Sequence, residues 1–579
     1  MHQGTTDQQL RYWIGQKLMI DIRQTCSPAH RCEDLTHLPA SYAAKIRQLQ
    51  LGGVILFANN LKHSAQIRQL TQDLHQSSGD GLPLLIGIDQ EGGRVARLPV
   101  TEYPAFAGAM ALGATQAHYG EQFPHQVAVA IARQLHELGI NLNFAPSLDV
   151  NNNKANPVIN VRSFGDQPAK VAAAGAAMVN AMQQHGVLAT IKHFPGHGDT
   201  HVDSHTGLPR VDHSLPVVQQ TDLAPFVAVL QHSQPAMVMT AHIQYPALDN
   251  STLVNKQGDS MLKPATLSRR MLTELLRQQM GYQGVIITDA LNMAGISQFF
   301  EPAEAVIQTF AAGADIALMP YEIRSEQDLT GLQQLIDAVL DAVVQGRLSV
   351  TELQQSAERV LSLRRTLAHQ KAPAPAPHRL SADRQLEQQL AEASLTQVGT
   401  NKLPTGWQLE GQRLLLIAPE QTKCQGWQQA LTLHQVKLQQ LNCATLDQSA
   451  AELQTLIDEA DTVLATLISP TQSAAELGVL ADLLALTPVQ LSPAEQKQKL
   501  LTALTYAKQQ GKRNLLVALR TPYDLSDFAD VADVRLATYS YNQQPFSAQR
   551  PLSGPAYDAV IACLLGKIQP KGQLPVQLD

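Results

Sequence analysis

Four histidines with regular spacing lie in one short segment, KHFPGHGDTHVDSH. They are His193, His197, His201 and His205. On a continuous helix, side chains four residues apart lie on one face, where imidazoles could bind a metal. A proline and two glycines interrupt the segment, at Pro195, Gly196 and Gly198. Because these residues disfavour a helix, the spacing does not predict a metal site, and we expect neither a metal nor a cofactor.

The end of the same segment contains a carboxylate two residues before an imidazole, at Asp203 and His205. A carboxylate bonded to one ring nitrogen orients the imidazole and raises the basicity of the other nitrogen. On a glycine-containing loop that follows a strand, such a pair could pass a proton to or from a substrate. The alternative interpretation of the Asp-Ser-His triplet is a solvated polar loop.

Two aspartates end apolar runs and could act as nucleophiles. Asp289 closes GVIITD, and Asp149 closes FAPSLD. A carboxylate at the end of a buried strand is held by a rigid element, as a catalytic nucleophile needs to be. The residues alone give both aspartates an equal claim.

Further polar residues stand at or near the ends of apolar runs. They are Asp89 with Arg97, Lys192 with His193, and His242. Burial of such a side chain without a partner costs several kcal/mol, so each must be paired, hydrated or functional. Any one of them alone could be a helix cap or a paired charge. Their recurrence at successive strand ends favours a shared site.

Eight apolar or β-branched runs alternate with segments of helical periodicity in the first part of the chain. They cover residues 16–22, 52–58, 83–89, 140–150, 188–194, 236–242, 284–290 and 314–320. Strands that alternate with helices predict a parallel sheet, and eight such units are typical of a (β/α)8 TIM-type barrel. The catalytic groups of such a barrel lie at the carboxyl ends of its strands. A doubly wound open sheet is the alternative fold.

An Ala-Pro-rich segment divides the chain. In AHQKAPAPAPHRL, the alternating prolines remove backbone donors and favour an extended conformation. We therefore predict a catalytic barrel over residues 1–367, a linker over 368–384 and a second domain over 385–579. Buried-type strands in RLLLIAP, DTVLATLIS, NLLVALRTP and VRLATYS predict that the second domain is a smaller α/β sandwich, with an order that the sequence leaves open.

The composition is that of a soluble globular protein. Over 579 residues, 44% are hydrophobic, 16% are charged, and the formal net charge is -7. This charge provides no basic surface for nucleic acid or for a membrane. We therefore expect a small, neutral or modestly charged partner.

The cysteines and the first residues bear on the cellular location. The five cysteines are odd in number, scattered and without zinc-site spacing, so the sequence predicts ordinary reduced thiols. No basic region followed by an apolar one begins the chain, and no later run is long enough to span a membrane. We therefore expect a cytoplasmic protein, although a removed signal would leave the same sequence. The oligomeric state stays open.

With these residues identified, the chain resembles glycoside hydrolase family 3, and within it the β-N-acetylglucosaminidase branch. The resemblance rests on IDQEGGRVARL, NVRSFG, KHFPGHGDTHVDSH and ITDALNM, and it extends through the whole barrel. It is weaker in the second domain, where NLLVALRTPYDL and GKIQPKGQLPVQL are similar to the family's α/β sandwich.

The resemblance implies a role for each matching residue. Asp289 matches the catalytic nucleophile, in preference to Asp149. His205 matches the general acid/base, with Asp203 as its partner. Five residues match positions that bind hydroxyls of the non-reducing-end sugar: Asp89, Arg97, Arg162, Lys192 and His193. Other branches, such as the β-glucosidases, usually take a glutamate acid/base from the second domain, and the Asp-Ser-His triplet argues against them.

The resemblance also implies an activity, which is retaining, exo-acting hydrolysis of a terminal β-linked N-acetylglucosamine through a covalent glycosyl-aspartate. Expected substrates are peptidoglycan fragments recycled in the cytoplasm or chitooligosaccharides. One alternative is a phosphorylase, because a histidine acid/base repels phosphate less than a carboxylate does. The others are a β-glucosidase-type activity, an inactive sugar-binding protein, and a metal hydrolase that uses the histidines.

Overall fold

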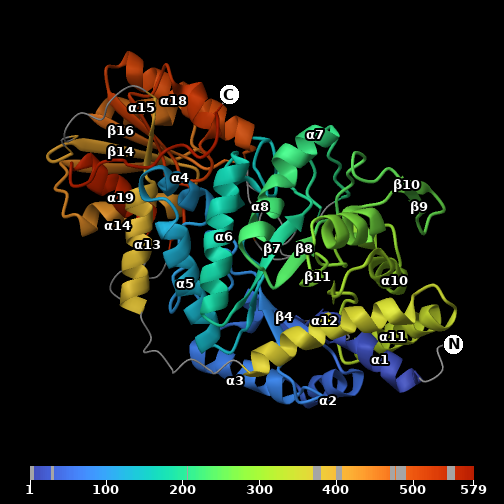
Figure 1. Cartoon of the computed structure of the whole chain (residues 1–579). Coiled ribbons are helices and arrows are strands. Elements are labelled where there is room, and N and C mark those ends of the chain that lie inside the picture. The colour runs from blue at the N-terminus through green and yellow to red at the C-terminus, as the bar shows by residue number, and fades with distance from the viewer. Residues whose placement is uncertain are drawn as a thin grey trace.

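A computed structural model describes residues 5–27, 32–204, 207–369, 380–399, 407, 409–469, 476, 491–543 and 554–578. Its strands form one sheet of eight strands, one of six, and two short sheets of two. In Figure 1 the eight-stranded sheet and its helices run from blue to yellow, and the six-stranded sheet with its helices is orange and red. The two large sheets define a barrel and a second domain.

The first sheet is a parallel barrel. Its strands are β1 (Leu18–Asp21), β4 (Gly53–Leu56), β5 (Leu85–Ile88), β6 (Leu142–Asn143), β7 (Leu188–Phe194), β8 (Met237–Thr240), β11 (Val285–Ile287) and β12 (Ala317–Leu318). They pair in the order β11-β8-β7-β6-β5-β4-β1-β12. A parallel bridge between Ile287 and Ile316 joins the two ends of this order. Each strand lies within one of the eight apolar runs, so the predicted barrel is confirmed and the open sheet is wrong.

Burial on both faces explains why these strands have continuous apolar sequences. Every residue of β1, β4, β5 and β8 is buried. Within β1, Met19 packs in one cluster with residues of other strands, such as Ile55 and Met239. Its neighbours Leu18 and Ile20 pack in the larger cluster that includes the helices. Each strand therefore divides its side chains between the barrel interior and the helix layer.

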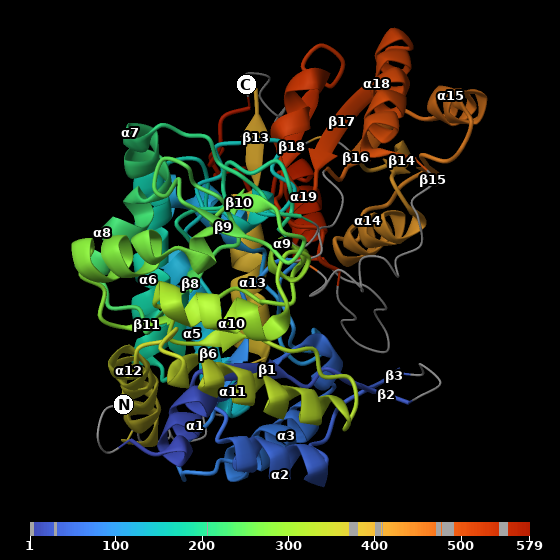
Figure 2. The same ribbon diagram turned by 90° about the vertical axis from the view of Figure 1, so that its right-hand side faces the viewer.

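Helices surround the barrel (Figures 1 and 2). The principal ones are α1 (Asp7–Gln16), α2 (Ala40–Leu49), α3 (Ser64–Gln76), α4 (Ala109–Tyr119), α5 (Gln122–Glu137), α6 (Pro168–Gln184), α8 (Ala224–His232), η5 (Arg270–Gln279), α10 (Pro302–Ala312), α11 (Asp328–Val344) and α12 (Val350–His369). Helix α1 packs against α11 and α12, which ties the beginning of the barrel segment to its end. In the described part of the chain, no helix has the length and apolar character needed to cross a membrane.

The connections that follow the strands carry short elements at the carboxyl ends of the strands. They are the hairpin of β2 (Gln24–Cys26) and β3 (Cys32–Asp34), η1 (Ala58–Asn60), η2 (Asn160–Arg162), α7 (Leu215–Val217), η3 (Val218–Asp222), the hairpin of β9 (Thr252–Val254) and β10 (Ser260–Leu262), η4 (Ala265–Leu267) and α9 (Ala294–Ser297). In Figure 2 the hairpin of β2 and β3 projects from the barrel. Catalytic groups of a barrel are carried by connections of this kind.

The second domain is a mixed sheet with helices. Its strands are β13 (Thr396–Val398), β14 (Arg413–Ala418), β15 (Gln440–Thr445), β16 (Thr462–Leu467), β17 (Arg513–Ala518) and β18 (Val534–Ala537), and its helices are α14 (Gln421–Leu433), α15 (Ala450–Glu459), α18 (Pro493–Gln509), η6 (Tyr523–Phe528) and α19 (Pro555–Leu564). The order is β13-β18-β17-β16-β14-β15, and only β13 pairs in an antiparallel way among these described strands. The predicted α/β fold is confirmed. Strands β13 and β15 were not predicted, because one is very short and the other is largely unburied.

Helix α13 (Leu380–Ser394) lies between the barrel and the second domain. It packs against α4 and α5 on one side and against α19 on the other (Figure 1). Arg133 of α5 forms an ion pair with Asp383 of α13, and Gln134 donates to the same carboxylate at 2.9 Å. Of the predicted linker over 368–384, residues 370–379 lie outside the described residues, and its two ends belong to α12 and α13.

Four of the five cysteines are paired. Disulfides join Cys26 to Cys32, which face each other across the hairpin of β2 and β3, and Cys424 to Cys443, between α14 and β15. Cys563 is free and buried. The prediction of reduced thiols is therefore wrong, because pairing depends on distances that scattered sequence positions do not reveal.

Candidate active site

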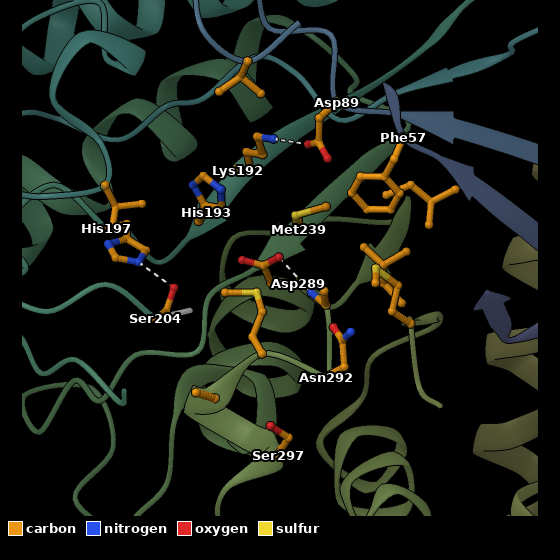
Figure 3. Close-up of a pocket in the computed structure, with 18 of the residues that line it drawn as sticks. Phe57, Asp89, Lys192, His193, His197, Ser204, Met239, Asp289, Asn292 and Ser297 are labelled. Atoms are coloured by element: carbon orange, nitrogen blue, oxygen red, sulfur yellow. Dashed lines mark hydrogen bonds and ion pairs between the residues drawn. The ribbon is translucent and has the colours of Figure 1, made fainter. Parts of the chain in front are cut away.

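A cavity of about 360 Å³ lies at the carboxyl ends of the barrel strands. Its wall includes one or two residues from each of several strand ends: Phe57 after β4, Asp89 after β5, Lys192 and His193 in β7, Met239 in β8, and Asp289 near the end of β11. Figure 3 shows these side chains around the open space. Residues far apart in the sequence therefore meet at one site because their strands are neighbours in the barrel.

Lys192 is the centre of a buried charged group on one wall. Its ammonium donates to Asp89 Oδ1 at 2.7 Å and to Glu91 Oε1 at 2.7 Å. Arg162, from η2, forms a bidentate ion pair with Glu91, at 2.9 Å from Nε to Oε2 and 2.7 Å from Nη2 to Oε1. Asp89, Lys192 and Arg162 line the cavity, and Glu91 does not. Two acids and two bases thus balance their charges at the wall.

Opposite charges decide the ionisation of this group. Burial alone would raise the pKa of Glu91, but the charges of Arg162 and Lys192 outweigh it and hold that pKa well below its usual range. Burial alone would lower the pKa of Lys192, but Asp89 and Glu91 outweigh it and raise that pKa. Glu91 and Lys192 therefore stay charged at neutral pH. The balanced group suits a polar ligand without net charge.

His193, next to Lys192 in β7, is held by Asp149. His193 Nδ1 lies 2.6 Å from Asp149 Oδ2, and Asp149 Oδ1 accepts the backbone N–H of His197 at 2.7 Å. Burial alone would raise the pKa of Asp149, but His193 outweighs it and keeps that pKa well below its usual range. His193 lines the cavity, whereas Asp149 is fully buried and does not. Asp149 therefore orients an imidazole and does not face a ligand.

Asp289 stands close to the end of β11 and lines the cavity. Its backbone N–H donates to the carbonyl oxygen of Thr240 in β8 at 3.1 Å, and its Oδ1 accepts the N–H of the next residue at 2.8 Å. In Figure 3 its carboxylate points toward the side of the cavity where His193 lies. The structure therefore separates the two aspartates that the sequence left equal, since Asp289 faces the cavity and Asp149 does not.

His197 is buried and lines another part of the wall. Its Nδ1 lies 2.7 Å from Thr200 Oγ1, its Nε2 lies 3.1 Å from Ser204 Oγ, and Asn156 donates to its carbonyl oxygen at 2.7 Å. Burial, followed by the charge of His193, lowers the pKa of His197 to about 4, so this imidazole is neutral at neutral pH. Among the residues that the structure describes, no group of three or more His, Cys, Asp or Glu is placed to hold a metal.

The loop that follows β7 carries the predicted proton-transfer pair. Asp203 is buried, and its carbonyl oxygen accepts the N–H of Gly207 at 3.0 Å. Asp203 is not part of the described lining of the cavity, but Ser204 is. The carbonyl oxygen of Ser204 accepts the N–H of Gly295 in α9 at 3.1 Å. His205 lies outside the described residues, so its placement stays a prediction, and the chain reaches the cavity wall one residue before it.

Arg97 links the cavity to the second domain. It is buried and lines the cavity, and its backbone N–H donates to Gln90 Oε1 at 2.7 Å. Its Nη1 donates to the carbonyl oxygen of Glu476 at 2.7 Å. Glu476 forms a buried ion pair with Arg520, which also donates to Asn160 Oδ1 at 3.3 Å. The second domain therefore supports the wall of the site, which the sequence did not predict.

Most of the predicted residues come together. Those that line the cavity are Asp89, Arg97, Arg162, Lys192, His193 and Asp289. His242, another strand-end candidate, does not, because its ring nitrogens lie 2.8 Å from Thr266 Oγ1 and 2.9 Å from the carbonyl oxygen of Ala290. This imidazole is fully buried and supports the connections around it.

Several residues of the site escaped the sequence analysis: Glu91, Phe57, Asn292, Glu322 and Arg324. Of these residues, Glu91 could have been predicted from the sequence, since it follows Asp89 by two residues in the same motif. Arg324 lies after β12 and pairs with Asp21 of β1 at 3.1 Å. No sequence pattern relates these positions, because only the closure of the barrel makes β12 a neighbour of β1.

Known proteins are similar to this chain, and some of them cover nearly all of it. A family model for the glycosyl hydrolase family 3 N terminal domain matches residues 10–363. Beta-hexosaminidase A of Pseudoalteromonas piscicida is 43% identical over 579 residues, covering 98% of this chain and 96% of the relative. A beta-hexosaminidase of Pseudomonas aeruginosa is 34% identical over 302 residues, covering 52% of this chain and 84% of its own.

Solved structures include a glycoside hydrolase family 3 beta-N-acetylglucosaminidase from Paenibacillus sp., with a TM-score of 0.77 and 30% identity. That match covers 98% of this chain and 99% of the other. The family model spans all eight barrel strands, and both the Pseudoalteromonas and the Paenibacillus proteins match the second domain as well. The chain therefore belongs to glycosyl hydrolase family 3, in the branch that contains the beta-hexosaminidases.

Proposed function

We propose that this protein is a beta-hexosaminidase that removes a terminal, non-reducing β-linked N-acetylglucosamine from small oligosaccharides, with retention of configuration. One observation carries the proposal: Asp289, held by the barrel, faces the same cavity as the charge-balanced group of Asp89 and Lys192. A neutral sugar offers hydroxyls that both donate and accept, so it can bind such a group without leaving a charge unpaired. The names of the relatives support the choice of sugar.

Asp289 is the proposed nucleophile. Because its backbone is bonded to β8, the carboxylate can hold its place beneath the anomeric carbon while the bond to the leaving oxygen breaks. Its attack forms a covalent glycosyl-aspartate and inverts the configuration once. Attack by water on this intermediate inverts it again, so the product keeps the β configuration. Lys192 and His193 bind ring hydroxyls during both steps.

His205 is the proposed general acid and base, with Asp203 as its partner. In the first step the imidazolium protonates the leaving oxygen, and in the second the neutral imidazole takes a proton from the attacking water. Histidine suits both tasks because it titrates near neutral pH. The position of Ser204 on the cavity wall supports the reach of this loop toward a sugar above Asp289.

The activity is tested with two aryl glycosides that differ only at the second carbon of the sugar. We expect turnover of the N-acetyl-β-glucosaminide, with kcat/KM roughly 100-fold above that of the β-glucoside. Nuclear magnetic resonance should detect the β anomer as the first sugar released. Turnover of neither glycoside, or first release of the α anomer, would contradict the proposal. Free sugar should form with and without phosphate, whereas a phosphorylase would release sugar 1-phosphate.

Two natural sources supply such a sugar, peptidoglycan fragments and chitooligosaccharides. Recycled wall fragments would be met in the cytoplasm, whereas the two disulfides favour action in an oxidising compartment. Comparison of kcat/KM for chitobiose and for a peptidoglycan-derived disaccharide, without phosphate, assigns the source. Cell fractionation with an antibody against the protein assigns the compartment.

A further inference from the structure

A cluster of titratable side chains lies outside the cavity, at the base of the loop that follows β7. His213 stands between two carboxylates, with Nε2 2.8 Å from Asp199 Oδ2 and Nδ1 2.8 Å from Asp222 Oδ2. Asp199 belongs to the loop, and Asp222 ends η3. The side chain of Asp222 is 2% exposed, that of His213 19% and that of Asp199 26%. These contacts connect a buried helix end to the loop.

Asp199 and His213 bracket the residues that carry the proposed acid and base. Residues 200–212 lie between them, and this stretch includes Asp203 and His205. The contact between Asp199 and His213 therefore closes the stretch at its base. Closing the ends of a loop restricts the conformations that its middle can adopt.

The part of the loop before Asp199 is held against the barrel. A Cβ on Gly196 would lie 3.1 Å from Asp222 Cβ and 3.3 Å from the hydroxyl of Tyr245, and that hydroxyl donates to the carbonyl oxygen of Gly196 at 2.7 Å. A Cβ on Gly198 would lie still closer to its neighbours, at 1.7 Å from the carbonyl oxygen of Val150. Residues 196–198 are therefore closely packed against the barrel. Asp199, the next residue, is held in place by this packing, and His213 at the far end of the loop contacts it.

The protons of the cluster are shared between three groups. An ionised carboxylate only accepts hydrogen bonds, so both contacts of His213 are made when its two ring nitrogens carry protons or when one carboxyl is protonated. Burial, together with the charge of Asp199, raises the pKa of Asp222 to about 6, although His213 opposes this shift. A protonated Asp222 carboxyl can donate to His213 Nδ1, so this contact does not require both ring nitrogens to carry protons.

We propose that His213 is a positioning residue for the acid/base step. By tying Asp199 to Asp222 it restricts the conformations of the stretch between residues 199 and 213, which carries Asp203 and the proposed acid/base His205. This inference rests on the proposed function. His213 does not line the cavity, so it acts through the loop and does not touch the sugar.

The test compares substrates that differ in their need for protonation. In His213→Ala and Asp199→Ala, kcat/KM for chitobiose should fall roughly 10- to 100-fold, because a misplaced acid protonates the leaving sugar poorly. For an aryl glycoside with a strongly acidic leaving group, kcat/KM should stay within about twofold, because that oxygen needs no proton. Inhibition by N-acetylglucosamine should not change. Asp199→Asn keeps an accepting oxygen and should recover most of the chitobiose activity.

The matched control is Asp212→Ala. Asp212 forms an exposed ion pair with Arg210, at 2.7 Å, one residue before His213. If His213→Ala and Asp199→Ala behave like this control, or if they slow both substrates equally, the positioning role is overturned. His205→Ala separates this failure from that of the proposed function. If His205→Ala itself shows no dependence on the leaving group, the acid role of the loop fails.

Discussion

Asp149 Oδ2 lies 2.6 Å from Nδ1 of His193, and Asp149 does not line the cavity that His193 faces. The strand-end aspartate that does face the cavity is Asp289. Two residues with the same chemistry and the same sequence context thus have different tasks. Asp149 contacts an imidazole of the cavity wall, and Asp289 itself lines the cavity.

Asp149→Ala should reduce stability and activity together. The change leaves the imidazole of His193 and the N–H of His197 without their acceptor, and breaking a buried pair typically costs about 3–5 kcal/mol. Urea unfolding measures the loss of stability, and kcat/KM measures the loss of function. Asp149→Asn keeps an accepting oxygen and should lose less of both. An Asp149→Ala variant as stable as the unmodified protein would contradict the assigned role.

Asp289→Ala should abolish turnover of every glycoside while leaving the fold intact. The bond from Asp289 to β8 is donated by its backbone N–H, which alanine keeps, so the change should remove the carboxylate without separating these two strands. A fluorosugar inactivator should label Asp289 in the unmodified protein, as peptide mass spectrometry can establish. A label on Asp149 would overturn the assignment of the nucleophile.

Glu91→Gln should lower stability in a way that depends on pH. Burial would raise the pKa of Glu91, but Arg162 and Lys192 outweigh it and keep that pKa well below its usual range. A lowered folded-state pKa adds stability that is fully present above the pKa of the unfolded chain, about 4.3, and is lost as the pH falls toward the folded-state pKa. The difference in unfolding free energy between the unmodified protein and Glu91→Gln should therefore be largest at neutral pH and should decrease below about pH 4.

The control for Glu91→Gln is Glu352→Gln. Glu352 pairs with Arg269 at 2.6 Å, and the two side chains are 49% and 47% exposed. Exposed pairs contribute about 1 kcal/mol or less, so this variant should unfold like the unmodified protein at each pH. If the difference in unfolding free energy between Glu91→Gln and the unmodified protein stays constant as the pH falls, the carboxylate charge is not the cause of the lost stability.

Arg520→Ala should raise KM more than it lowers kcat. The change leaves Glu476 buried without its partner, and the carbonyl oxygen of Glu476 holds Arg97 at the cavity wall. Steady-state kinetics with an aryl N-acetylglucosaminide measures both parameters. Lys497→Ala is the matched control, because Lys497 pairs with Asp524 and Asp527 at the surface of the same domain. A fall in kcat at constant KM would contradict the conclusion that Arg520 and Glu476 hold Arg97 in its binding position.

Peptide mapping without reduction should recover two linked pairs, Cys26 with Cys32 and Cys424 with Cys443. Cys563 should react slowly with an alkylating reagent in the folded protein, because burial raises the pKa of its thiol to about 11 and thiolate is scarce at neutral pH. After unfolding without reductant, a single thiol should react. Alkylation of all five cysteines in unreduced protein would contradict the pairing.

The barrel could be predicted because each strand is buried on both faces and therefore carries a continuous apolar run, as in LATIKHF of β7. The site could be predicted in part for the same reason. A charged residue at the end of such a run, such as Lys192 or Asp289, stands out against its neighbours, and parallel strands bring such ends to one rim.

The amino-acid sequence by itself thus determined the alternation of strands and helices, and which polar residues end the strands. Only the tertiary structure decided that Asp289 faces the cavity while Asp149 turns behind His193, that Glu476 of the second domain holds Arg97, and that four cysteines pair. The physical reason is distance. Burial and periodicity are recorded locally along a chain, whereas the direction of a side chain and a contact between separate elements, such as that of Arg97 with Glu476, arise only when the elements pack together.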